Sequence, residues 1–288
     1  MVLFNLPSPV HLGIFMIRFT AFVGIAALAS ASLTSGELAK SKELPWDGRF
    51  NDIKVKDIGT KYLTHILDMR NNSADAGAKN YVKINQKGRT LAYNEDKGVA
   101  YIKVDNSSVF KAQHNFRRSE LVQFVKTNPK GKTFFRASFI KQEPFLNEHV
   151  WQIFFAESQM FQVRVDAKAK PPTLIFLCNG EWDPKWQAEF KYNTWYNFGV
   201  AISKDPKGDG AVVEFYTSMG DKDLKLEKTF TVVTKFALFE ELHIGLLTLS
   251  DSEKVAPVMN ENGDFIGFNG VTVKDHVSTS AAGVTVGF

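Results

Sequence analysis

The stretch from His149 to Asn179, HVWQIFFAESQMFQVRVDAKAKPPTLIFLCN, decides the fold. It holds three segments of alternating or continuous apolar character, at 149–158, 161–167 and 173–179. This pattern is typical of β-strands rather than helices. Together with the further strand-like segments along the chain and the frequent turns between them, the stretch favours an antiparallel sheet.

The same apolar character recurs along most of the chain. Turn signals such as NPKGK, DPKGDG, SMGDKD and NENGD separate many of these segments. Helical periodicity is scarce, and 59–69 is the best candidate for a short helix. We find no repeat and no long linker, so we expect an all-β, antiparallel jelly-roll sandwich in a single domain, with a core rich in phenylalanine. The further predicted strands are 98–105, 115–124, 133–142, 195–204, 211–218, 229–236, 242–250 and 267–275.

Composition narrows the class of partner. Of 288 residues, 44% are hydrophobic, and 35 basic and 31 acidic residues give a net charge of +4. No Lys/Arg cluster resembles a nucleic-acid footprint. We therefore expect a monomer whose partner is neutral or weakly charged, with no nucleic acid and no stable membrane insertion.

The N-terminus has the features of a secretory signal. The apolar run from Phe19 to Ala31 ends in an Ala-Ser-Ala cleavage site and is too short to span a bilayer. Arg18 would interrupt a signal that starts at Met1, so we expect Met16 to be the initiator. The predicted organisation is a signal region at 1–31, a polar lead-in at 32–43, the jelly roll at 44–276 and a loose C-terminal tail at 277–288.

Cysteine and glycosylation patterns agree with a secreted chain that relies on its core for stability. Cys178 is the single cysteine, which excludes a disulfide framework, and its apolar surroundings predict a buried, inert thiol. Asn71 and Asn106 begin N-x-S sequons and are glycosylation candidates.

Several chemistries lack their sequence signatures. The chain has no phosphate-binding loop, no dinucleotide fingerprint, no G-x-S-x-G elbow and no H-E-x-x-H zinc helix. The segments NEDKG and DPKGDG lack the acidic spacing of calcium loops and are expected to be hairpin turns. We therefore expect no cofactor and no metal.

Charged residues in predicted strands are the candidate catalytic groups. Arg118 and Glu120 are two residues apart and so point to one face of a strand. Glu148 lies at a strand entrance, and His243 lies between apolar residues. Glycoside hydrolysis needs one protonated and one ionised carboxyl group. Arg118 would keep Glu120 ionised as base, leaving Glu148 as acid, although these roles can be exchanged. A surface ion pair and a core histidine are the alternative interpretations.

Exposed indoles would suit a site that binds sugar rings. The turn-rich segment GEWDPKWQ (180–187) places Trp182 and Trp186 between strands, where they either form sugar subsites or pack ordinarily. Trp151, Trp46 and Trp195 are expected to be packing residues.

Five segments together resemble glycoside hydrolase family 131: WDGRFND (46–52), RRSEL (117–121), NEHVWQIFFAES (147–158), LHIGLLTLS (242–250) and FNGVTVKD (268–275). The resemblance implies a secreted β-jelly roll that hydrolyses β-1,3-, β-1,4- or β-1,6-linked glucans, with inversion. The family's arginine, two glutamates and histidine match Arg118, Glu120, Glu148 and His243 as catalytic residues, and the same resemblance makes His149 and Gln152 substrate-binding candidates.

Two alternatives remain open from the sequence. A jelly-roll lyase acting on a polyuronate also carries R-S-E-L, but its Q-I-H strand is Gln152-Ile153-Phe154 here, without the histidine. A lectin-like carbohydrate-binding domain would use the same tryptophans without needing two opposed glutamates.

Overall fold

The strands form two antiparallel sheets in a computed structural model that describes residues 41–71, 76–250, 252 and 254–283. The strands are β1 (Trp46–Asp47), β2 (Val82–Asn85), β3 (Val99–Val104), β4 (Phe116–Lys126), β5 (Thr133–Ile140), β6 (Val150–Ala156), β7 (Phe161–Asp166), β8 (Thr173–Cys178), β9 (Trp186–Glu189), β10 (Tyr196–Lys204), β11 (Ala211–Met219), β12 (Lys225–Val232), β13 (Phe239–Leu249) and β14 (Asp264–Lys274). The helical segments are η1 (Val55–Thr60), α2 (His65–Asp68) and α3 (Ala78–Tyr81).

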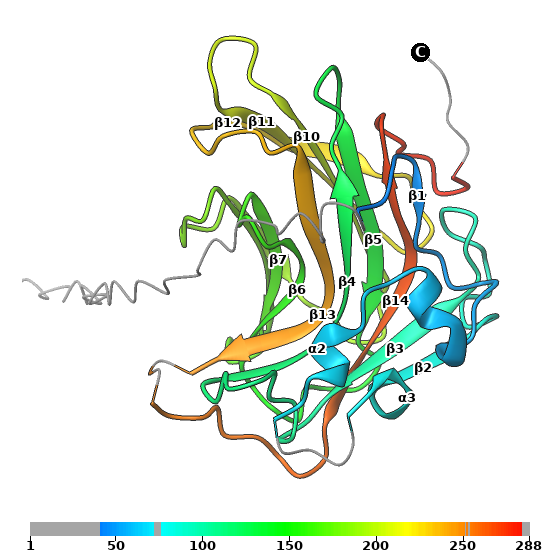
Figure 1. Cartoon of the computed structure of the whole chain (residues 1–288), viewed down its shortest axis with the longest axis vertical. Coiled ribbons are helices and arrows are strands. Elements are labelled where there is room, and N and C mark those ends of the chain that lie inside the picture. Colours follow the sequence, from blue (N-terminus) through cyan, green and yellow to red (C-terminus); the bar gives the residue numbers. More distant parts are fainter. Residues whose placement is uncertain (1–40, 72–75, 251, 253, 284–288) are drawn as a thin grey trace, which may run out of the picture. The chain divides into compact units, whose positions relative to one another are not determined.

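The two sheets lie in separate layers (Figure 1). The eight-stranded sheet has the order β12-β11-β10-β5-β14-β3-β2, with β1 paired to β14. The six-stranded sheet has the order β4-β13-β6-β7-β8-β9. The antiparallel, all-β jelly-roll sandwich predicted from the sequence is confirmed.

The sequence prediction missed short elements and misplaced one longer strand. β2 and β9 have four residues each and were not predicted. The helix expected at 59–69 is instead the end of η1 followed by the four-residue α2. The strand expected at 229–236 begins earlier, as β12. Short elements carry too few residues for a period to show.

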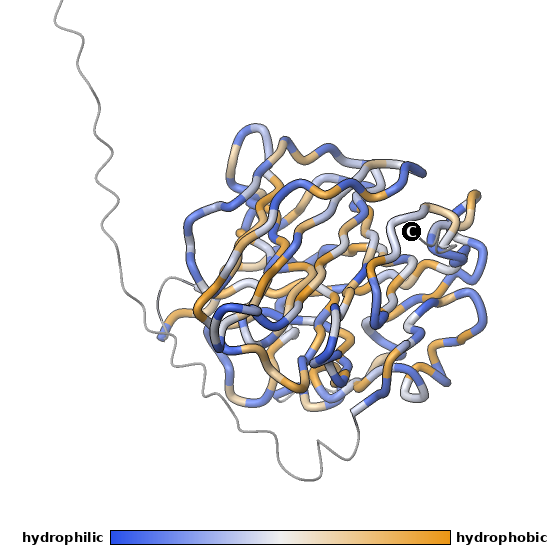
Figure 2. The backbone as a smooth tube through the Cα atoms, turned by 90° about the horizontal axis from the view of Figure 1, so that it is seen from above, coloured by the Kyte–Doolittle hydropathy of each residue, from blue (hydrophilic) through white to orange (hydrophobic). Residues whose placement is uncertain are grey.

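Aromatic side chains join the two sheets across the core. The rings of Phe176 on β8 and Phe215 on β11 stack with centroids 3.9 Å apart. Those of Phe135 on β5 and Phe161 on β7 lie 5.4 Å apart. Figure 2 shows hydrophobic segments along the strands and hydrophilic ones in many peripheral loops. Burial of these rings supplies much of the hydrophobic stabilisation of the sandwich.

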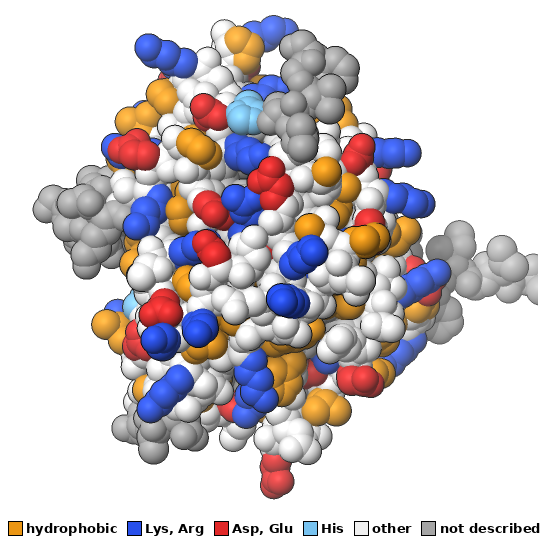
Figure 3. Space-filling view, turned by 90° about the vertical axis from the view of Figure 1, so that its right-hand side faces the viewer, with side chains coloured by type: hydrophobic (Ala, Val, Ile, Leu, Met, Phe, Trp, Pro, Cys, Tyr) orange, Lys and Arg blue, Asp and Glu red, His pale blue; other side chains and the backbone are white. Residues whose placement is uncertain are grey.

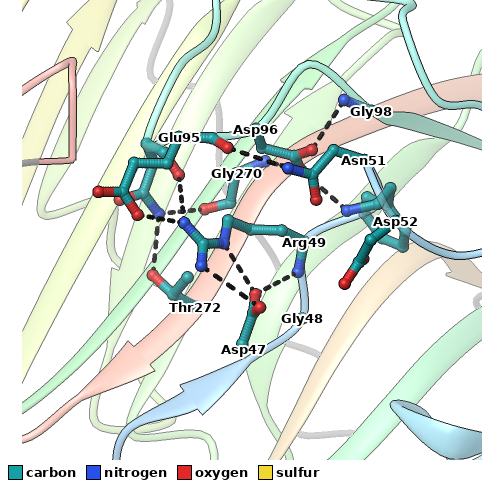
Figure 4. A network of polar contacts seen from close by, with 12 residues as sticks. Asp47, Gly48, Arg49, Asn51, Asp52, Glu95, Asp96, Gly98, Gly270 and Thr272 are labelled. Atoms are coloured by element: carbon teal, nitrogen blue, oxygen red, sulfur yellow. Dashed lines mark hydrogen bonds and ion pairs between the residues drawn. The ribbon is translucent and has the colours of Figure 1, made fainter.

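The W-D-G-R-F motif is part of a structural network that ties β1 to β14 (Figure 4). Arg49 forms ion pairs with Asp47 and Glu95. The buried Asp96 carboxylate accepts hydrogen bonds from three backbone N–H groups, those of Phe50 (3.1 Å), Gly98 (2.7 Å) and Gly270 (2.9 Å). The Asn94 amide donates to the carbonyl of Gly270 at 2.8 Å and to Thr272 at 2.9 Å.

Replacing Asp96 with Asn is expected to lower the free energy of unfolding without impairing catalysis. The amide offers one acceptor oxygen in place of two, so at least one buried N–H group loses its partner, at a cost of about 1–3 kcal/mol. Asp52→Asn is the matched control, because Asp52 is 64% exposed and Lys61 is its one ion-pair partner among the described residues. Chemical denaturation and kcat measure both variants. Loss of kcat in Asp96→Asn at wild-type stability would contradict a structural role.

The structure bears on the predicted C-terminal tail but not on the predicted signal region. The signal region at 1–31 lies outside the described residues, as does the lead-in up to residue 40. The tail expected to be loose is held in place over 277–283. Arg136 donates to the carbonyls of Ser278 and Ser280 at 2.8 Å each, and Asp223 accepts from the N–H of Ala281 at 2.7 Å. The sequence gives no sign of this because the partners lie far away in the chain.

The structure also shows the positions of Cys178 and of the two glycosylation candidates. Cys178 is buried, which raises the pKa of its thiol to about 12. Asn106 is exposed and Asn71 is half-buried. The face drawn in Figure 3 carries Lys and Arg interspersed with Asp and Glu. None of the described helices is long and apolar enough to cross a membrane.

Candidate active site

Three of the four catalytic candidates, Arg118, Glu120 and His243, gather on the face of the six-stranded sheet that is turned away from the core. On β13, Leu242 and Ile244 belong to the core, so His243 between them points to the opposite face. On β4, Leu121 belongs to the core, and Glu120 therefore points the same way as His243. The two strands are neighbours, with Glu120 opposite Gly245.

Arg118, Glu120 and His243 form a fully buried ion cluster. Arg118 donates to Glu120 through Nε (2.8 Å to Oε1) and Nη2 (2.6 Å to Oε2). The Nδ1 atom of His243 lies 2.6 Å from Oε2 of Glu120. Glu120 is 0% exposed and is thus held by two cationic partners. The pairing of Arg118 with Glu120 is an internal contact rather than a solvated surface ion pair.

Two further carboxylates approach the other nitrogen of His243. Its Nε2 atom lies 3.3 Å from Oε1 of Glu241 and 3.5 Å from Oε2 of Glu157. This nitrogen makes no hydrogen bond of acceptable geometry with any described residue. Phe155 stacks on the imidazole with ring centroids 4.5 Å apart, which fixes the plane of the ring.

The environments of the carboxyl groups drive their pKa values apart. Burial opposes ionisation of Glu120, but the charge of Arg118 and the hydrogen bond from His243 lower its pKa to about 2. Burial also opposes the charge on His243, yet Glu120 and the nearby carboxylates raise its pKa to about 9. For Glu157, burial dominates and raises the pKa. Near neutral pH the site thus holds an ionised Glu120, a cationic His243 and a carboxyl, Glu157, that retains its proton more readily than usual.

Irregularities in two strands create this arrangement. β6 has a register shift between Gln152 and Phe154, so that Ile153 and Phe154 both belong to the core. The strand phase therefore reverses, and Phe155 and Glu157 reach the face of His243. On β13, Gly245 is needed for close approach, because a Cβ there would lie 2.7 Å from Cα of Glu120.

The structure does not bring Glu148 to this site. Glu148 precedes β6, whereas His243 pairs with Phe155 near the end of that strand, seven residues further on and so roughly 23 Å away along it. Its side chain is 56% exposed and forms an ion pair with Lys170. This position does not fit the prediction that Glu148 is the second carboxyl beside Glu120; Glu157, nine positions later in the same segment, lies next to His243 instead.

Of the substrate-binding candidates, Gln152 lies on the face of the ion cluster, whereas His149 and Trp186 lie elsewhere. His149 lies at the far end of β6, where its Nε2 atom is 2.8 Å from the carbonyl oxygen of Val258. Trp186 is half-buried, pairs with Phe176 and packs against Phe215, which favours the packing alternative for this residue. Trp182 is 68% exposed.

Residues that the sequence did not single out complete the site. Besides Glu157 and Glu241, α2 brings His65 into electrostatic range of His243 and Glu120. Burial lowers the pKa of His65, so it stays neutral more readily than usual. No set of three or more His, Cys, Asp or Glu among the described residues is arranged to hold a metal ion.

The family model of the glycoside hydrolase 131 catalytic N-terminal domain matches residues 44–279. The chain belongs to glycoside hydrolase family 131. Two solved structures have the same fold. The GH131 β-glucanase catalytic domain from Podospora anserina is 21% identical, with a TM-score of 0.65, over 83% of this chain and 98% of that one. The GH131 catalytic domain from Coprinopsis cinerea is 18% identical, with a TM-score of 0.62 and the same coverage. No curated protein matches.

Membership makes this chain a glycoside hydrolase domain, and the match spans the jelly roll predicted at 44–276. The segments that resemble the family lie in two different parts of the structure. The 46–52 motif forms the structural network between β1 and β14, whereas RRSEL and LHIGLLTLS supply the ion cluster.

Proposed function

We propose that the protein is a secreted enzyme that hydrolyses β-linked glucans through two carboxyl groups, Glu157 as general acid and Glu120 as base. The observation that carries the proposal is the bridge made by His243. Its two ring nitrogens contact Glu120 and Glu157 from opposite sides, at 2.6 Å and 3.5 Å. These contacts limit the separation of the two oxygens to about 8 Å, compatible with the roughly 6.5–9.5 Å of inverting enzymes.

Each carboxyl group has a defined task in this reaction. Glu157 is half-buried with a raised pKa, and in its protonated form it gives its proton to the leaving glycosidic oxygen. The ionised partner takes a proton from the water that attacks the anomeric carbon from the other side. The cationic His243 fixes the spacing of the two groups and supports the ionised state of Glu120.

The base role of Glu120 requires access for water. Its oxygens are bonded to Arg118 and His243, so a water molecule reaches them only when one of these side chains moves. Glu241 is 21% exposed and lies 3.3 Å from the same histidine. A Glu241→Gln variant therefore discriminates, because its inactivity beside an active Glu120→Gln variant would transfer the base role to Glu241.

The substrate class is tested with the purified chain from Ser32 onward. β-1,3-, β-1,4- and β-1,6-glucans, alginate and glucuronan are incubated separately, while reducing ends and the ultraviolet absorbance of unsaturated ends are followed. We expect new reducing ends from a glucan without that absorbance. NMR should show that the first-formed products have inverted anomeric configuration. A rise in this absorbance with a polyuronate as substrate would show that the protein is a lyase rather than a hydrolase. Binding without any cleavage would indicate a lectin-like domain.

A further inference from the structure

A second arginine, Arg164, lies in the same lateral row of side chains as Arg118. Leu247 on β13 pairs with Arg118 on one side and with Gln152 on the other, and Gln152 pairs with Arg164 on β7. The row spans four adjacent strands, so Arg164 lies about 14 Å from Arg118 across the sheet. Val163 and Val165 belong to the core, which turns Arg164 to the face of the ion cluster.

The guanidinium of Arg164 is buried without a counter-charge. It is 5% exposed and donates to Gln162 Oε1 from Nε (2.8 Å) and Nη2 (2.5 Å), and to Gln152 Oε1 from Nη2 at 3.3 Å. No described carboxylate forms an ion pair with it. Burial alone lowers its pKa to about 10. Arg118, by contrast, is neutralised by Glu120.

A second donor beside Arg164 also lacks a partner. Gln152 is 4% exposed, and its Nε2 group makes no hydrogen bond with any described residue. Its amide orientation is set by Arg164, which requires the oxygen to face the guanidinium. The row thus presents a surplus positive charge and an unused buried N–H donor, and an acceptor with negative charge would satisfy both.

An aromatic ring covers this position. The indole of Trp182 lies over Arg164, with the guanidinium carbon 4.4 Å from the ring centroid. Trp182 is 68% exposed, so most of its surface is available to a ligand. An indole next to buried donors combines stacking on a sugar ring with recognition of a polar substituent.

We propose that Arg164, Gln152 and Trp182 form a subsite for a sugar unit that carries a carboxylate, a uronic acid residue within the glycan. The sugar ring stacks on Trp182, and the carboxylate accepts hydrogen bonds from Arg164 and Gln152 once the exposed indole moves aside from the guanidinium that it covers. The inference rests on the proposed glucanase function, because the subsite lies a few sugar units from Glu157 along the same face. It identifies the preferred substrate as a glucan with acidic units rather than a wholly neutral one.

The test compares paired oligosaccharides of equal length, β-1,4- and β-1,3-linked, each neutral and after oxidation at C6 to glucuronic acid. Binding is measured by calorimetry with the full chain. We expect the oxidised member of one pair to bind at least about tenfold more tightly at low salt, as a charge-assisted contact allows. Arg164→Gln should abolish the difference and Arg164→Lys should retain part of it. Trp182→Ala should weaken both members of the pair.

Two outcomes would overturn the subsite: equal affinity of wild type for both members, or an undiminished preference in Arg164→Gln. Thermal unfolding shows that the variants are folded. Inorganic phosphate and sodium acetate are titrated as well, and binding of these ions as tight as that of the oxidised oligosaccharide would reduce the site to a simple anion site. Neutral-glucan hydrolysis is assayed separately. If neutral glucan is hydrolysed but both members of each pair bind equally well, only the subsite is rejected. If neutral glucan is not hydrolysed but the preference for the oxidised member depends on Arg164, only the glucanase function is rejected.

Discussion

Glu157→Gln is expected to lower kcat on a β-glucan by about 10²–10⁴-fold, the usual contribution of a general acid. Glutamine keeps the size and polarity of the side chain but has no proton to give to the leaving oxygen. Because Glu157 lies at the face of the site and is 37% exposed, its replacement should leave folding and oligosaccharide affinity close to wild type. Initial rates give kcat, and calorimetry gives the dissociation constant.

The leaving group and the pH profile identify which role Glu157 has. An aryl β-glucoside with an acidic phenol needs little protonation, so the variant should retain far more activity on it than on glucan. The raised pKa of Glu157 sets the alkaline limb of wild-type kcat, since activity falls as that proton is lost. The variant should lack this limb.

Glu148→Gln is the matched control for this experiment. Glu148 was the sequence-predicted acid, but it is exposed and pairs with Lys170. A surface substitution of this kind is expected to change kcat by no more than about twofold. A large loss in Glu148→Gln together with an active Glu157→Gln would refute the assignment made from the geometry.

Much of the fold could be predicted from the sequence because its long strands are rich in apolar residues and are buried along most of their length. β4, β13 and β14 have 11 residues each, which is long enough for their apolar character to identify them as strands. Arg118 and Glu120 could be placed on a common face for the same reason. β9 could not, because its four residues owe their position to pairing with β8 rather than to a period of their own.

The site was predicted only in part, because a β-bulge changes which face of the sheet the following side chains point to. Counting by twos from Trp151 places Glu157 on the core side. The register shift in β6 puts both Ile153 and Phe154 in the core and returns Glu157 to the face of His243. No residue type in that segment announces the shift. The role of Trp186 stayed open for a related reason, because its packing depends on cross-strand pairing with Phe176.

Glu120→Gln is expected to abolish turnover and to lower the free energy of unfolding by about 3–5 kcal/mol, because it leaves the buried Arg118 without its counter-charge. Glutamine can accept a hydrogen bond from Arg118 but cannot neutralise it. The double variant Arg118→Met/Glu120→Gln removes both charges and should recover much of the stability while remaining inactive. An active, fully stable Glu120→Gln variant would exclude both roles of this carboxyl.

The same cluster predicts how wild-type stability depends on pH. The pKa of His243 is raised to about 9 in the folded state, so its contribution is complete below the unfolded value near 6.5 and disappears as pH rises through 9. The pKa of Glu120 is lowered to about 2, so its contribution is complete above roughly 4.3 and disappears as pH falls through 2. Stability should therefore be greatest between about pH 4.3 and 6.5 and decline by up to about 3 kcal/mol toward pH 9. Denaturation series across pH measure this. In Glu120→Gln the alkaline decline should be much smaller, because His243 has lost the partner that holds its proton; an unchanged decline would assign it to other groups.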